Sequence, residues 1–301
     1  MTDTQTAAIP RGALVRMTIG AALISTTSIF VRWAHVAPTT SAFYRMLFGG
    51  IMLFVLLLAR RQWRRPSMAE LLVLTFPALM FGVDLMMWHR SIREVGPGLA
   101  TLLGNLQVFI MAGVGIVFYR ERPGWRFALG VLLALAGLYL LVGVGWDKLT
   151  PAYRFGVLLG LLTGVAYAVF MLSLRRAQMR SSRLTPEWTL CLVSVLCAIA
   201  LGGAVAAENA GFAIPDAQSW MSLLGLGLFG QVLGWVLIAR AMPQLPASLV
   251  GLLLLLQPVL SFLLDVILFA RPTAASGWIG LALSLVGIFI ASSRRRAPES
   301  A

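Results

Sequence analysis

Runs of about twenty mostly apolar residues follow one another along almost the whole chain, and no other feature constrains its fold as strongly. The hydrocarbon core of a bilayer is roughly 30 Å thick, so a helix that crosses it needs about 20 such residues. A helix also satisfies its own backbone polar groups, which hydrocarbon cannot do. The predicted spans, separated by Gly, Pro and Arg residues, cover 13–33, 40–59, 69–89, 97–118, 124–145, 155–174, 187–207, 218–239, 246–269 and 274–292. We therefore predict an all-α membrane protein with ten transmembrane helices.

The composition agrees with a chain that lies mostly in lipid. Of 301 residues, 59% are hydrophobic and 12% are charged, and the mean hydropathy is +0.88, whereas soluble domains carry about 25% charged residues. A net charge of +13 would suggest a nucleic-acid partner in a soluble protein. Here the basic residues form short clusters between the apolar runs, so we expect a lipid bilayer and no nucleic acid as partner.

The arrangement of basic residues predicts how the chain is oriented. Seventeen Arg residues lie at the termini and in every second gap between spans, whereas the other gaps hold five Arg and Lys residues. Short loops rich in Arg and Lys stay on the cytoplasmic side. We therefore expect a multi-pass protein with both termini in the cytoplasm.

The two halves of the chain resemble each other. The stretch "GPGLATLLGNLQVFIMAGVGIVFYRERP" (96–123) is similar to "LPASLVGLLLLLQPVLSFLLDVILFARP" (245–272), at an offset of 149 residues. Each half then holds five spans, and an odd number inverts the second copy in the membrane. We expect domains at 12–146 and 154–293. Inverted repeats are typical of alternating-access transporters, whose substrate site lies between the halves.

Asp84 is the most informative polar residue, because a charged side chain at the centre of a bilayer costs about 2.5–3.5 kcal/mol. It either faces a cavity, where it could carry a proton or hold a substrate amine, or forms a structural ion pair with Arg45. Trp88 shares its helix face. Trp88 and the neighbouring His89 either bind substrate or anchor the helix at the membrane interface.

Other polar and aromatic side chains inside the spans extend the candidate cavity. Gln257, Ser261 and Asp265 form one polar stripe, and Pro258 frees a backbone carbonyl beside it. The alternative for such side chains is hydrogen bonding that only holds helices together. Further candidates are Thr101, Asn105, Thr163, Tyr167, Gln231 and Trp235.

Several kinds of site have no counterpart in the sequence. No stretch has the spacing of metal ligands, no nucleophile has a base and an orienting partner, and no glycine-rich loop is of the phosphate-binding type. We expect no metal, no cofactor and no enzymatic activity. A membrane-embedded enzyme that uses Asp84 and Asp265 is an alternative, as is a structural membrane subunit.

The motifs resemble a known family. "FYR" at the start of the second span and "ATLLGNLQVF" in the fourth are similar to the EamA repeat of the drug/metabolite transporter superfamily, over about residues 14–292. The pattern Asp84, Trp88, His89 and Asn105 resembles one bacterial subgroup. Arg90 departs from it where an aromatic residue is common, and Glu121 of the first repeat is matched by Ala270 of the second, which suggests a local role for Glu121.

The resemblance implies secondary transport of a small metabolite across a bacterial inner membrane. We expect an exporter of an amino acid or an amino-acid-derived compound, such as an opine-type metallophore, coupled to protons. An importer of a similar compound is the alternative, and a homodimer is one arrangement that the sequence allows. The expected binding or coupling residues are Asp84, Trp88, Asn105, Tyr167, Gln231, Trp235, Gln257 and Arg45.

Overall fold

The computed structural model of the chain describes residues 10–119, 124–143, 146–180, 185–245 and 247–292, and all regular structure within these ranges is helical. Glu121, for which we expect a local role, lies outside them. The elements are α1 (Arg11–Trp33), α2 (Pro38–Ala59), α3 (Met68–Val95), α4 (Pro97–Gly104), α5 (Gln107–Tyr119), α6 (Trp125–Leu138), η1 (Tyr139–Gly143), η2 (Trp146–Lys148), α7 (Pro151–Arg180), α8 (Pro186–Ala207), α9 (Ala217–Gly225), η3 (Leu226–Gly234), α10 (Trp235–Ala241), η4 (Met242–Gln244), α11 (Ala247–Leu254), α12 (Leu256–Phe269) and α13 (Ala275–Ser292).

The helices have the length and composition of membrane spans. Nine helical segments of the described chain are long and apolar enough to cross a bilayer, and Ala275–Ala291 in α13 is a shorter apolar helix. Together these ten segments occupy the ten predicted positions. The prediction of an all-helical membrane architecture is therefore confirmed.

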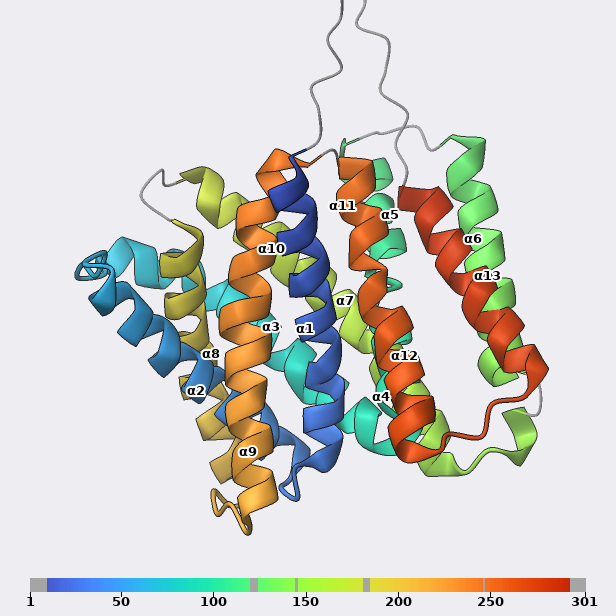
Figure 1. Cartoon of the computed structure of the whole chain (residues 1–301), viewed down its shortest axis with the longest axis horizontal. Coiled ribbons are helices and arrows are strands. Elements are labelled where there is room, and N and C mark those ends of the chain that lie inside the picture. Colours follow the sequence, from blue (N-terminus) through green and yellow to red (C-terminus); the bar gives the residue numbers. More distant parts are fainter. Residues whose placement is uncertain (1–9, 120–123, 144–145, 181–184, 246, 293–301) are drawn as a thin grey trace, which may run out of the picture.

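The second half of the chain is inverted relative to the first. We call the side of the bundle where α1 begins at Arg11 and α13 ends at Ser292 the terminal face (top of Figure 1). The first helix, α1, runs from the terminal face to the opposite face, whereas α7, the first helix of the second half, runs the other way (Figure 1). Five spans in the first half produce this inversion.

The two halves pack into each other along their whole length. Helix α3 lies against α7, α2 against α8, and α6 against α13, while α1 contacts η3, α10 and α12. The contact between α6 and α13 is so close that a side chain on Gly130 would place its Cβ 2.5 Å from the carbonyl oxygen of Gly287. Residues from both halves therefore line whatever space remains between them.

Helix α3 is longer than the predicted apolar span, and two arginines near its end contact other segments. The predicted span stops at residue 89, whereas α3 continues to Val95 and ends at Gly96, whose φ is 87°. Arg90 pairs with Glu208 at 2.5 Å, and Arg93 donates a hydrogen bond to the carbonyl of Val36. Arginine is a good helix former, so the helix continues beyond the apolar span that the hydropathy pattern marks.

Candidate functional site

A cavity of about 310 Å³ lies between the two halves of the bundle. Its walls come from α1, α2, α3, α4, α5, α7, α10, η4, α11 and α12, so each half contributes several helices. The cavity extends toward the terminal face as far as Met242, which is exposed. Its polar and aromatic lining consists of Thr27, Arg45, Asp84, Trp88, Thr101, Asn105, Gln107, Thr163, Tyr167, Trp235 and Gln257.

Two spans are interrupted beside this cavity, at positions that correspond in the two repeats. The predicted span 97–118 is divided into α4 and α5, and 246–269 is divided into α11 and α12. The first break lies at Asn105 and Leu106, and the second lies at Leu255, which is the counterpart of Leu106 at the offset of 149 residues. Paired breaks of this kind in inverted repeats mark substrate sites in transporters.

The second break is caused by a proline. Pro258 has no backbone N–H, so the carbonyl four residues earlier, on Leu254, loses its helical hydrogen bond and meets the proline ring. The amide of Leu255 instead bonds to Leu252, three residues earlier, at 3.2 Å. Gln257 follows directly and lines the cavity.

The first break occurs without a proline. The side-chain amide of Asn105 donates to the Thr101 carbonyl at 2.8 Å, the same oxygen that its backbone N–H approaches at 3.2 Å. A side chain that bonds locally competes with the helical backbone pattern. The next amide, of Leu106, bonds only three residues back, to Leu103 at 3.1 Å. Two different chemical causes therefore open the helix at the same place in each half.

Arg45 of α2 and Asp84 of α3 supply the two charges of the cavity lining. Their exposed fractions are 4% and 5%, and they are close enough for each to experience the charge of the other. They do not form a direct ion pair, and within the described part of the chain neither side chain accepts or donates a hydrogen bond. Both charges therefore remain available to a ligand.

Aromatic and amide side chains surround these charges. The guanidinium carbon of Arg45 lies 5.4 Å from the centroid of the Trp88 ring, a cation–π contact. Tyr167 and Trp235, both partly exposed to the cavity, come from the second half of the chain. His89 is fully buried and does not line the cavity, although it is next to Trp88.

Seven of the eight expected site residues thus line one cavity, and Gln231 does not. Gln231 is fully buried, and its side-chain nitrogen donates to Ser194 of α8 at 3.1 Å. It lies in η3, where the backbone follows a π-helix. A π-helix has more residues per turn than an α-helix, so the α-helical spacing of Gln231 and Trp235 does not describe their directions.

The cavity is closed toward the face opposite the termini. Ser261 of α12 bonds to the hydroxyl of Ser28 on α1 and lies 3.2 Å from that of Thr101 on α4. One turn further along, Asp265 accepts hydrogen bonds from the amide of Gly98 at 3.0 Å and from Arg271 at 3.1 Å. Two members of the predicted polar stripe therefore connect helices beyond the cavity, and only Gln257 faces into it.

Some lining residues give no signal in the sequence. Ile24, Met111, Met171 and Leu254 contribute apolar wall to the cavity. In a chain that is 59% hydrophobic, such residues cannot be told from lipid-facing ones. Their place depends on how the helices pack.

Inverted repeats of membrane-spanning helices, with paired helix breaks around a cavity lined by both halves, are the architecture of many membrane transporters. The chain belongs to the EamA-like transporter family, which matches residues 12–143 and 154–293. It is a multi-pass membrane transporter of this family, within the drug/metabolite transporter superfamily that its motifs resemble.

Relatives span nearly the whole chain. The uncharacterized transporter YwfM of Bacillus subtilis (strain 168) is 25% identical over 288 residues, which are 94% of each chain. An uncharacterized transporter of Archaeoglobus fulgidus is 24% identical over 273 residues, 91% of this chain and 93% of its own. A solved structure, titled a crystal structure of protein, matches with a TM-score of 0.65 at 20% identity over 93% of this chain and 96% of its own, which supports the fold.

Proposed function

We propose that this transporter exports a small amino-acid-like metabolite that carries both a carboxylate and an ammonium group. The observation that carries the proposal is the presence of Arg45 and Asp84 in one cavity, both buried and neither ion-paired with a described residue. A buried charge without a partner is costly. A zwitterion supplies a partner for each charge at once, since guanidinium groups bind carboxylates and carboxylates bind ammonium groups.

The broken helices support the same class of substrate. Helices α5 and α12 begin beside the cavity, and the N-terminal end of a helix carries partial positive charge. Helices α4 and α11 end there, with carbonyl groups that carry partial negative charge. A cavity that offers both signs of charge suits a ligand with both signs.

Asp84 is also the proposed coupling group. When its cavity holds no substrate, Asp84 has no cationic partner in direct contact among the described residues, and a proton would neutralise the carboxylate at the lowest cost. A substrate ammonium group would replace that proton. Exchange of one cation for the other at a single carboxylate couples substrate movement to the proton gradient.

Export is proposed together with an orientation in a bacterial inner membrane. Helix α1 begins and α13 ends at the terminal face (Figure 1), and the arginine-rich segments of the sequence fall at helix ends on that face; such segments remain in the cytoplasm. The cavity extends toward that face and is closed toward the other by Ser261 and Asp265. In this orientation the cavity would open to the cytoplasm, where an exporter would bind its substrate and an importer would release it, and the deletion experiment below distinguishes the two.

Comparison of metabolites in cells with and without the gene for this protein tests the proposal. We expect an amino-acid-like compound to accumulate in the cytoplasm of the deletion strain and to decrease in its medium. Restoring the wild-type protein should reverse both changes, and restoring Asp84→Asn should not. The conservative variant Glu208→Gln, which lies outside the cavity, serves as a matched control. A compound that instead accumulates in the medium on deletion would indicate uptake and contradict export.

A further inference from the structure

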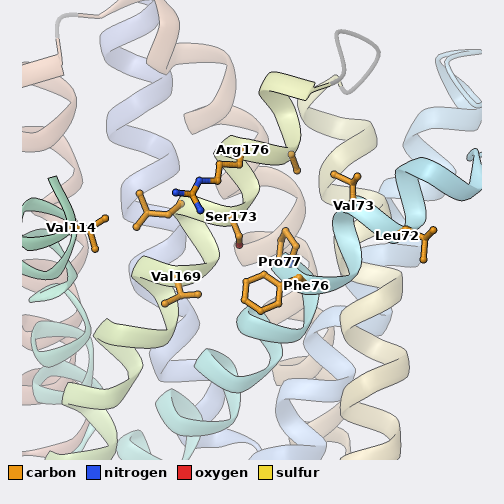
Figure 2. Close-up of a pocket in the computed structure, with 10 residues that line it drawn as sticks. Leu72, Val73, Phe76, Pro77, Val114, Val169, Ser173 and Arg176 are labelled. Carbon is orange, nitrogen blue, oxygen red and sulfur yellow. The ribbon is translucent and has the colours of Figure 1, made fainter. Parts of the chain in front are cut away.

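A second hollow lies on the side of the bundle, separate from the central cavity. It is a groove of about 650 Å³ between α3 and α5, with α7 as its floor, and Figure 2 shows the side chains that line it. Its walls are almost entirely apolar. The residues that define it best are Leu72, Phe76, Val114, Val169, Ser173 and Arg176.

The groove lies within membrane-spanning helices and opens to their outer surface. Leu72 and Phe76 of α3 are 68% and 52% exposed, as expected of side chains that face lipid. Leu72 is four residues from the first residue of α3, and Arg176 is four residues from the last residue of α7. Both of these ends lie at the terminal face (Figure 1). The groove therefore extends into the bilayer from the level of the lipid headgroups.

Arg176 is the only charged residue among the described residues that line the groove. Its side chain extends from α7 across the upper end of the groove toward the side where Val114 of α5 lies (Figure 2). No described residue forms an ion pair or a hydrogen bond with it. Ser173, the other polar residue of the lining, donates to the carbonyl of Phe170 at 2.9 Å. A cationic group without a partner among the described residues thus lies at the headgroup end of a largely apolar groove.

We propose that this groove binds a phospholipid with an anionic headgroup, whose phosphate contacts Arg176 and one of whose acyl chains lies along α7 between α3 and α5. The groove has a positive charge at its headgroup end and apolar walls along the rest of its length, and an anionic phospholipid has a negative headgroup and apolar acyl chains. Long basic side chains near helix ends reach the headgroup region, and basic pockets between transmembrane helices recognise anionic lipid headgroups. An uncharged or zwitterionic lipid would leave the Arg176 charge without net compensation.

The test is lipid retention by the purified full-length protein. Protein in mixed micelles with equal amounts of phosphatidylglycerol and phosphatidylcholine is analysed by native mass spectrometry, and the bound lipids are counted. We expect wild type to retain phosphatidylglycerol preferentially. Arg176→Gln should lower the ratio of retained phosphatidylglycerol to phosphatidylcholine about fivefold, the equivalent of about 1 kcal/mol for one arginine at the membrane surface.

Matched variants separate the groove from general surface charge. Arg175→Gln removes the same charge from the adjacent, exposed position outside the groove lining and should leave the ratio unchanged. Leu172→Trp fills the groove and should reduce retention of both lipids, whereas Leu158→Trp, at an exposed position elsewhere on α7, should not.

Several results would overturn the proposal. These are equal retention of the two lipids by wild type, an equal loss in the Arg175 and Arg176 variants, or a protein dimer that occupies the groove and dissociates in Leu172→Trp. Variants are compared only as monodisperse preparations, and a lipid-induced rise in melting temperature provides a second readout. The experiment measures lipid binding and no transport, so neither result affects the proposal about the substrate.

Discussion

Replacing Asp265 with asparagine is expected to destabilise the fold because it leaves Arg271 without its charged partner. Asp265 is 3% exposed and accepts from Gly98 at 3.0 Å and from Arg271 at 3.1 Å. An asparagine oxygen can still accept from Gly98, so the loss falls on Arg271. Breaking a buried pair costs about 3–5 kcal/mol. Arg271 keeps its hydrogen bonds to Val95 and Tyr153, which places the expected cost near 3 kcal/mol, at the lower end of that range.

Thermal unfolding in one detergent, followed by tryptophan fluorescence, measures this cost. The matched control is Glu208→Gln, which breaks the ion pair with Arg90. Those side chains are 35% and 31% exposed, and solvent-screened pairs contribute about 0.2–1 kcal/mol. We expect the decrease in melting temperature to be at least threefold larger for Asp265→Asn, in line with these magnitudes. Equal decreases would refute the inference that Asp265 and Arg271 form a buried, desolvated pair.

Two further predictions concern packing and pH. Gly98→Ala should cost about 1–3 kcal/mol of stability, because the added Cβ would lie 2.5 Å from the Cα of Phe262. The control Gly113→Ala, whose added Cβ would have no atom within 4 Å, should not lower the melting temperature. Equal shifts in melting temperature for the two variants would contradict the packing argument. Hydrogen bonding to His35 lowers the pKa of Asp216. The contact therefore stabilises the protein at pH values above about 3.9, the ordinary pKa of aspartate. This stabilisation is lost as the pH falls through the lowered pKa of Asp216. The difference in melting temperature between wild type and Asp216→Asn should shrink toward pH 3, and a constant difference would contradict the assignment.

The sequence predicts the number and inversion of the spans because both depend on properties that need no tertiary structure. Apolar runs of bilayer length mark the helices, and an odd number of spans in each repeat inverts the second copy. The breaks inside two spans were harder to predict. Pro258 signals one of them, whereas the other depends on a local hydrogen bond from the Asn105 side chain to Thr101. Asparagine is also found in unbroken helices, so no rule based on residue type identifies it.

The same contrast holds for the cavity. Arg45, Asp84 and Gln257 stand out in the sequence because a polar group in hydrocarbon is costly and needs a cavity or a partner. That rule does not say which of the two applies. Gln231 has a partner, because its side chain donates a hydrogen bond to Ser194. It lies in a π-helical segment, which the sequence does not predict. The apolar wall, such as Met171, follows only from packing.

Recognition of a zwitterion by Arg45 and Asp84 is tested most directly by removing one charge from the ligand and one from the protein. Binding of the metabolite identified by the deletion experiment is compared, by isothermal titration calorimetry, with binding of its N-acetyl derivative and of its carboxamide. Wild type, Arg45→Gln and Asp84→Asn are measured, with Glu208→Gln as the control outside the cavity.

Wild type should bind each derivative at least about tenfold more weakly than the parent compound, because one buried charge then lacks its partner. Asp84→Asn should lose the discrimination against the N-acetyl derivative only, and Arg45→Gln the discrimination against the carboxamide only. Glu208→Gln should retain both preferences. Wild-type binding of both derivatives as tight as that of the parent compound would contradict the proposed roles of Arg45 and Asp84.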